Sequence, residues 1–182
     1  METEKELLDK IVDGDRTAMR RFYDRYAGYA MATSRRYIPD YDAAQDIVQD
    51  SFVKCFTNIG KFKYMGEGSL KGWFLRIVSN AAIDYVKKQS GLCFTDEFPE
   101  TDYDDVDEAD VEDVPLDVIN EFIGQLPVGY RAVFNLYVFE KKSHKEIAQQ
   151  LNIKENSSAS QFSRAKKMLA RMINDFVKNN KQ

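Results

Sequence analysis

A strongly acidic segment interrupts this chain and limits how it can fold. Residues 89–130 contain 13 Asp or Glu and no Lys or Arg. The centre of this segment, residues 95–115, has too few apolar side chains to build a core, and its like charges repel one another. We therefore expect an extended acidic linker at 91–115 between two small domains, at 1–90 and 116–182.

The remaining charge is also unevenly distributed. Residues 1–88 hold 15 Lys or Arg against 13 Asp or Glu, whereas residues 131–182 hold 11 basic residues against 4 acidic ones. The modest net charge of −4 therefore hides a basic C-terminal part. Such asymmetry indicates a part that binds a polyanion beside a separate acidic segment.

Composition favours an all-α fold made of two small helical domains. The chain is 43% apolar and 13% aromatic, which is enough for two small cores, and it has only four prolines. No apolar run approaches the roughly 20 residues that span a bilayer, so we expect no membrane insertion. The first residues are rich in Glu and Lys and do not resemble a signal peptide, which predicts a cytoplasmic protein.

The residues that usually carry chemistry are few. Cys55 falls on an apolar helical stripe, which predicts a reduced core cysteine, and His144 is expected to be a solvated side chain in the first turn of a helix. Asp46 and Asp50 form an acid pair one turn apart, but no nucleophile or metal ligand stands beside them. We expect no metal, no cofactor and no enzymatic activity.

Residues 143–169 carry the signals of a helix-turn-helix. Ser143 and Glu146 have the spacing of a capping box, which starts a helix, and Asn152 tolerates the left-handed turn that follows. The second helix has an apolar stripe at steps of three and four, made of Phe162, Ala165, Leu169, Met172 and Phe176. Its other side carries Ser160, Arg164, Lys167 and Arg171.

Short polar residues followed by cations are typical of a recognition helix, which meets base edges with its first turns and phosphates with the rest. The pattern also fits an ordinary helical hairpin with a solvated basic face.

The N-terminal part is predicted to be consecutive helices. Asp15 can cap a helix that ends near Tyr37, and Asp42 with Gln45 has capping-box spacing for the next one. The first has an expected inner face of Met19, Phe22, Tyr23, Tyr26 and Ala30. The second points Ile47, Ser51, Phe52, Cys55 and Phe56 inward and Asp46, Gln49, Asp50 and Lys54 outward.

Residues 61–69 combine two lysines, two aromatic residues and two glycines in a loop. Aromatic rings between cations suit an unstacked base and its phosphate, although a surface loop pinned by Phe62 in the core has the same pattern. The helix that begins near Leu70 should bury Leu70, Phe74, Ile77, Val78, Ala81 and Tyr85. Its polar side then carries Arg76, Asn80, Asp84, Lys87 and Lys88.

Four runs of sequence, taken in order, resemble the sigma-70 family of RNA polymerase sigma factors, and within it the extracytoplasmic-function (ECF) group. They are DIVQDSFVKCF (46–56), KFKYMGEGSLKGWFLRIVSNAAIDYVKK (61–88), QLPVGYRAVFNLYVFEKKSHKEIAQQLNI (125–153) and SRAKKML (163–169). The resemblance implies a region 2 domain at 1–90, an acidic linker at 91–115 and a region 4 domain at 116–182.

The resemblance also implies partners: core RNA polymerase, through its β′ clamp helices and its β subunit, and promoter DNA. Whether an anti-sigma factor also binds stays open. The implied polymerase-binding residues are Asp46, Gln49, Asp50 and Phe52. Those that capture and melt the −10 element are Lys61, Phe62, Lys63, Tyr64, Arg76, Asn80, Lys87 and Lys88. Those that read the −35 duplex are Lys154, Ser157, Ser158, Ser160, Gln161, Arg164 and Lys167.

The start of the second helix is less basic than is usual in this family, because Ala159 and Gln161 stand where a basic residue is common. Since glutamine can pair bidentately with adenine, we expect Gln161 to read one base pair. The sequence leaves two other functions open. One is a stand-alone helix-turn-helix regulator, and the other is an acidic helical adaptor without a DNA role.

Overall fold

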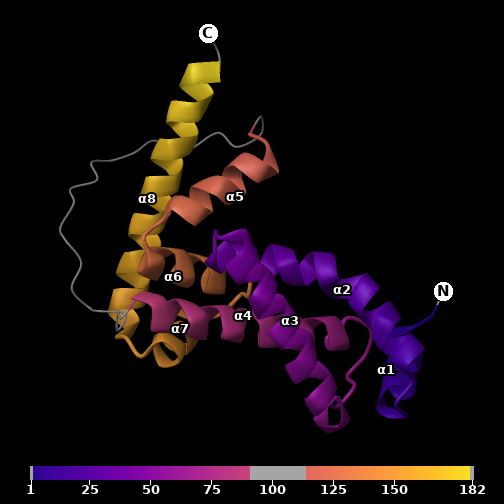
Figure 1. Cartoon of the computed structure of the whole chain (residues 1–182). Helices are drawn as coiled ribbons and strands as arrows, with labels where there is room; N and C mark the ends of the chain where they lie inside the picture. The colour runs from indigo at the N-terminus through magenta and orange to yellow at the C-terminus, as the bar shows by residue number, and fades with distance from the viewer. Residues whose placement is uncertain (1, 91–113, 181–182) are drawn as a thin grey trace. The chain divides into compact units, whose positions relative to one another are not determined.

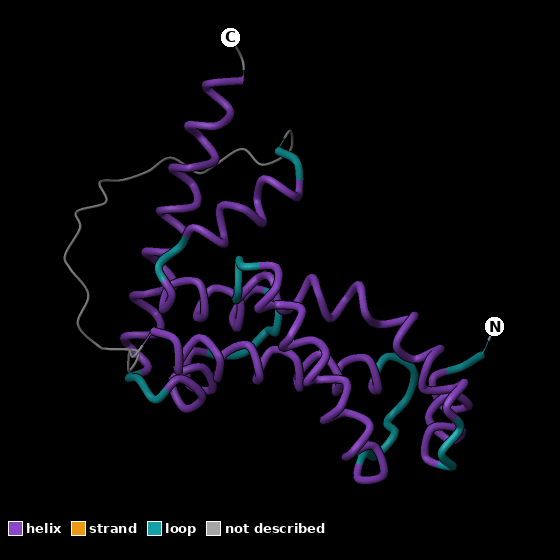
Figure 2. The backbone as a smooth tube through the Cα atoms, in the orientation of Figure 1, coloured by secondary structure: helices purple, strands orange, loops and turns teal. Residues whose placement is uncertain are grey.

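The structure is a computed structural model of the whole chain, and it describes residues 2–90 and 114–180. Over these ranges the chain forms helices and loops with no strand (Figures 1 and 2). Its internal contacts divide it into two compact units, Met1–Tyr85 and Val86–Gln182. The acidic linker expected at 91–115 falls almost entirely outside the described residues.

Unit 1 is a helical unit whose elements follow one another closely in the chain. Its elements are α1 (Glu4–Val12), α2 (Arg16–Tyr37), α3 (Tyr41–Asn58), the short 3₁₀ helix η1 (Ile59–Lys61) and α4 (Ser69–Ser90), which continues past the unit boundary. Short polar side chains start the first three α-helices. Asp15 accepts hydrogen bonds from the backbone N–H groups of Thr17 and Ala18, as expected for the cap of α2.

The core of unit 1 is built around three phenylalanines, one from each long helix. Phe22 of α2, Phe52 of α3 and Phe74 of α4 are buried, and their ring centroids lie 4.5 to 6.0 Å apart. Aromatic pairs at these distances contribute about 0.5–1.5 kcal/mol each beyond the area that they bury. The three rings therefore fix how α2, α3 and α4 pack together.

Sequence-based expectations in unit 1 were wrong at the cap of α3 and at Tyr23. The cap of α3 is Asp40, whose carboxylate accepts from the N–H of Ala43, and Asp42 lies inside the first turn. Tyr23 is 42% exposed although its ring contacts Phe52 at 4.7 Å, because it lies at the edge of the buried face of α2. Cys55 is fully buried as expected, and burial raises the pKa of its thiol to about 12.

Unit 2 contains four further helices, α5 (Leu116–Gln125), α6 (Val128–Val138), α7 (His144–Leu151) and α8 (Glu155–Asn180). Helices α5 and α6 each begin directly after a proline, which restricts the backbone at a helix start. Part of its core joins α5, the loop after it, α6 and α8, and consists of Ile123, Leu126, Tyr130, Ala165 and Leu169. Within the described ranges no helix is long and apolar enough to cross a membrane.

Candidate nucleic-acid interface

Helices α7 and α8 form the expected helix-turn-helix. Ser143 and Glu146 make a complete capping box at the start of α7, and Asn152 ends it in the left-handed conformation with φ 56° and ψ 49°. Asparagine is one of the few residues that adopt this conformation at low cost. The turn from Asn152 to Lys154 then leads into α8.

The buried face of α8 is rotated from the one that the apolar pattern predicted. Its buried side chains are Ser158, Gln161, Ala165, Leu169 and Ile173. The expected stripe was correct at Ala165 and Leu169, but Phe162, Met172 and Phe176 are only half-buried. Positions 161 and 162 both lie about one turn before Ala165, so the helical period alone does not decide between them.

This rotation corrects two of the residues expected to read the −35 duplex. Ser158 is 0% exposed and Gln161 is 1% exposed, so neither can reach a base edge from this position. Gln161 is therefore a core residue, and the expectation that it pairs with adenine was wrong. Ser158 lies with its hydroxyl 3.0 Å from the imidazole Nδ1 of His144.

His144 is not the solvated side chain that the sequence suggested. It is half-buried and stacks on Tyr137, with centroids 4.7 Å apart and an angle of 19° between the rings. Phe162 packs against Tyr137 at 4.3 Å. These aromatic contacts from α6, α7 and α8 brace the helix-turn-helix.

The first turns of α8 leave one face exposed. Ser160 is exposed as expected, together with positions that sequence reasoning did not select, Asn156, Ala159, Ser163 and Lys166. Two of the cations selected from the sequence, Arg164 and Lys167, are less exposed. Arg164 is half-buried with Nη1 3.5 Å from the hydroxyl of Tyr130, and Lys167 is half-buried. Of the remaining expected residues, Lys154 is exposed and Ser157 is half-buried.

In unit 1 the loop at residues 62–68 is anchored at one end and exposed at its tip. Phe62 is half-buried and packs on Trp73, with centroids 4.9 Å apart, and Tyr64, two residues later in the chain, is also half-buried. Lys61 and Lys63 are exposed. Phe62 thus pins the loop, as the surface-loop interpretation expected, and binding of an unstacked base by its neighbours stays a prediction.

Met65 at the tip of this loop was not selected from the sequence. It is 85% exposed, a high value for an apolar side chain, and Gly66 follows it with φ +113°. Methionine is among the apolar residues that DNA-bending proteins wedge between bases. The sequence offered no signal for it, because exposure in a loop cannot be read from a helical period.

The polar side of α4 was also expected to bind the −10 element. Arg76, Asn80 and Lys88 are exposed, and Lys87 is half-buried. Arg76 and Asn80 are four positions apart and thus lie on the same face of the helix. The structure confirms the expected exposure of Arg76, Asn80 and Lys88 but not of Lys87, and their roles in DNA binding stay predictions.

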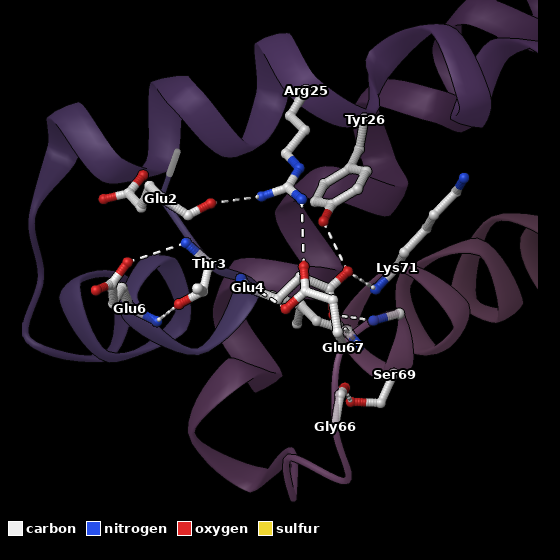
Figure 3. A network of polar contacts seen from close by, with 12 residues as sticks. Glu2, Thr3, Glu4, Glu6, Arg25, Tyr26, Gly66, Glu67, Ser69 and Lys71 are labelled. Carbon is white, nitrogen blue, oxygen red and sulfur yellow. Dashed lines mark hydrogen bonds and ion pairs between the residues drawn. The ribbon is translucent and has the colours of Figure 1, made fainter.

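A network of carboxylates holds the start of α4 (Figure 3). Glu4 of α1 is 2% exposed, and its carboxylate accepts hydrogen bonds from the backbone N–H groups of Gly68, Leu70 and Lys71. The hydroxyl of Tyr26 donates to the same carboxylate at 2.8 Å. This arrangement gives Tyr26 a raised pKa, through burial first and then its bond to Glu4.

The outward face of α3 carries the expected polar residues. Asp46, Gln49 and Asp50 are all exposed. Phe52, which the resemblance placed among the polymerase-binding residues, is 4% exposed and belongs to the three-phenylalanine core. A direct contact of Phe52 with a partner is therefore excluded in this conformation, because its ring is covered by Phe22 and Phe74.

Two family models match this chain. Residues 22–91 match sigma-70 region 2, and residues 116–169 match sigma-70 region 4, so the two segments together cover more than half of the sequence. The chain belongs to the sigma-70 family. It is an alternative sigma factor, a subunit that directs transcription initiation, and not a stand-alone regulator.

Curated relatives place this sigma factor in the ECF group. It is 26% identical over 183 residues to the ECF RNA polymerase sigma-E factor of Haemophilus influenzae, which covers 94% of this chain and 95% of the relative. It is 25% identical over 137 residues to the ECF sigma factor SigM of Bacillus subtilis, over 74% of this chain and 82% of that protein.

A solved structure has a similar fold. The sigma factor RpoE from Bartonella quintana, solved in complex with the anti-sigma factor NepR, matches with a TM-score of 0.52 and 18% identity. The match covers 85% of this chain and 96% of that one. In the present chain, the residues that the structure describes contain no group of three or more His, Cys, Asp or Glu side chains that could hold a metal ion.

Proposed function

We propose that the exposed face of α8 binds the −35 element in the major groove. The side chains that could meet base edges are small or polar in the first turns, at Asn156, Ala159, Ser160 and Ser163. Lys166 follows one turn later, where a recognition helix meets phosphate. This set replaces the one based on Gln161, because it uses only side chains that solvent reaches.

The loop at residues 62–68 and the polar face of α4 together bind the −10 element as a single strand. Lys61 and Lys63 meet the phosphates, and Tyr64 and Met65 contact unstacked bases. Asn80 offers an amide that can both donate and accept at a base edge. Extruding a base costs a few kcal/mol, which these contacts must offset.

The exposed carboxylates of α3 bind core RNA polymerase. Asp46 and Asp50 lie one turn apart with Gln49 between them, and together they form an acidic, hydrogen-bonding face on the helix. Charge complementarity across an interface speeds the encounter and excludes wrong partners. The protein performs no chemistry of its own, and it acts in the cytoplasm, where core polymerase binds promoters.

The observation that carries this proposal is the left-handed turn at Asn152, since it joins α7 to an α8 whose first turns face solvent. The test is transcription in vitro by core polymerase with and without this protein, on a library randomised at the −35 and −10 positions. We expect the protein to enrich transcripts that share one motif at each element. Transcripts enriched at neither element would contradict the proposal.

A further inference from the structure

Helix α4 begins without a cap of its own. The residue before its first turn is Gly68, which has no side chain and adopts φ +89°, so it cannot supply the oxygen that usually accepts from the first N–H groups. That oxygen comes from α1 instead. Glu4, 64 positions earlier, accepts from Gly68 at 2.8 Å and from Leu70 and Lys71 at 3.2 Å each.

The bonds to Glu4 use both of its carboxylate oxygens. Oε2 accepts from the N–H groups of Gly68 and Leu70, whereas Oε1 accepts from the N–H of Lys71 and the hydroxyl of Tyr26. A negative charge at this place also interacts favourably with the positive end of the helix dipole. An amide in the same position has one oxygen and one NH₂ group. The NH₂ group cannot accept hydrogen bonds, so two of the donors around Glu4 would lose their acceptor.

The loop before α4 in turn supplies a carboxylate that binds the start of α1 (Figure 3). Glu67, in the loop, accepts from the backbone N–H of Glu4 at 3.2 Å and from the hydroxyl of Tyr64 at 3.3 Å. Arg25 of α2 lies 3.4 Å from the other oxygen of Glu67. The start of α1 and the loop before α4 thus bind each other through two carboxylates.

This reciprocal pairing restricts the conformation of the loop. Within the loop, the hydroxyl of Ser69 donates to the carbonyl of Gly66 and accepts from the N–H of Met65 at 3.2 Å. Two glycines in the left-handed region would otherwise give the segment many conformations. Because both ends of the loop are held, the side chains of Tyr64 and Met65 have defined positions on the surface.

We propose that Glu4 is a positioning residue for −10 recognition: by capping α4 from α1, it holds the 62–68 loop in the arrangement that selects bases. This inference rests on the proposed role of that loop in binding the −10 element. Glu4 itself is buried and touches no DNA. Preordering a binding loop lowers the entropy lost on binding and sharpens the discrimination between similar ligands.

The test compares Glu4→Gln with Glu6→Gln in the full chain bound to core polymerase. Glu6 stands in the same first turn of α1, is exposed, and caps only its own helix through Thr3. Holoenzymes transcribe a library randomised at the −10 element, and the readout is the enrichment of preferred over average sequences. This ratio does not depend on the fraction of active protein, so a general loss of folded protein would not change it.

We expect Glu4→Gln to flatten −10 enrichment about tenfold, since it breaks hydrogen bonds made to a buried charge. Enrichment at a −35 library should stay unchanged, and so should both readouts for Glu6→Gln. Unchanged −10 enrichment in Glu4→Gln, with normal assembly on polymerase, would overturn the inference.

Two further variants separate the possible failures. Glu67→Ala removes the reciprocal bond from an exposed position and should flatten −10 enrichment even if Glu4→Gln does not fold. Tyr64→Ala tests the loop directly. If Tyr64→Ala flattens the enrichment while Glu4→Gln and Glu67→Ala do not, the inference fails and the loop's proposed role stands. If none of the three changes it, the role of the loop itself is wrong.

Discussion

Gln161 shows how a single residue changes role when its position is known. Both polar atoms of its side-chain amide are buried, and neither has a hydrogen-bond partner among the residues that the structure describes. A buried, unpaired polar group costs about 1–3 kcal/mol relative to one that is paired or solvated. Gln161 is thus a destabilising residue in the interior of unit 2, and its substitution by an apolar residue of similar size should help folding.

We predict that Gln161→Met raises the free energy of unfolding by about 1 kcal/mol, because methionine fills the same space without an unpaired amide. Urea unfolding of the full chain followed by circular dichroism measures the change. The control is Gln149→Met, at an exposed position of α7, which should change stability by less than about 0.5 kcal/mol. A loss of preference at one −35 base pair, with stability unchanged, would restore Gln161 as a base-reading residue.

Asn80 is the second residue whose role can be tested alone. We predict that Asn80→Ala reduces open-complex formation on duplex promoter more than on a promoter with a pre-melted −10 bubble, because the bubble needs no further unpairing. Permanganate footprinting of both templates measures open complexes. Asn120→Ala, at an exposed position of α5, is the matched control. An equal loss on both templates would mean that Asn80 has a structural role.

At the scale of helices, features set by neighbouring residues could be predicted from the sequence, whereas contacts between distant segments could not. The starts of α2 and α7 follow from Asp15 and Ser143, since the partners of each cap lie only two or three residues further along the chain. The residue that caps α4 could not be predicted, because Glu4 lies 64 positions before the N–H group of Gly68 that it accepts from. The rotation of α8 was missed for a related reason: which side faces the core depends on α6 and α7, not on α8 alone.

The exposed face of α8 leads to a prediction about salt. Lys166→Ala should lower the slope of log affinity against log salt by about one for −35 duplex binding by the holoenzyme, because one phosphate contact is lost. Lys178→Ala removes an equal charge from an exposed position near the far end of the same helix, and it should leave the slope unchanged. Equal salt slopes in both variants would show that Lys166 does not contact a phosphate.

Helix caps also predict how unit 1 responds to acid. Backbone N–H groups of Ala18 and Thr17 lower the pKa of Asp15 from its ordinary value of 3.8, and the backbone of Thr3 lowers the pKa of Glu6 from 4.5. A carboxyl with a lowered folded pKa stabilises the fold above its unfolded pKa, and this contribution is lost as pH falls through the folded value.

We therefore predict that the melting temperature decreases as the pH is lowered below about 4. Asp15→Asn keeps a capping oxygen that does not titrate, so its melting temperature should fall less steeply over this range. Thermal unfolding between neutral and acidic pH, followed by circular dichroism, compares the two proteins. Parallel curves would show that Asp15 does not contribute to acid sensitivity.

At the scale of the whole molecule, the division into two units has a functional consequence. Two units that each bind one promoter element, as proposed above, gain little effective concentration from each other when the segment between them does not fix their spacing. The protein alone should therefore discriminate poorly between promoter and random duplex. We propose that core polymerase supplies this geometry by holding unit 1 through the outward face of α3.

The most direct test of this account is charge reversal at Asp50. Asp50→Lys should abolish assembly with core polymerase and promoter-specific transcription while the circular dichroism spectrum stays the same, because Asp50 is exposed and surface substitutions change stability by only about 0.5 kcal/mol. Asp13→Lys makes the same charge change at an exposed position at the end of α1, and it should assemble and transcribe normally. Tight promoter-specific binding by the isolated protein, unaffected by Asp50→Lys, would contradict the account.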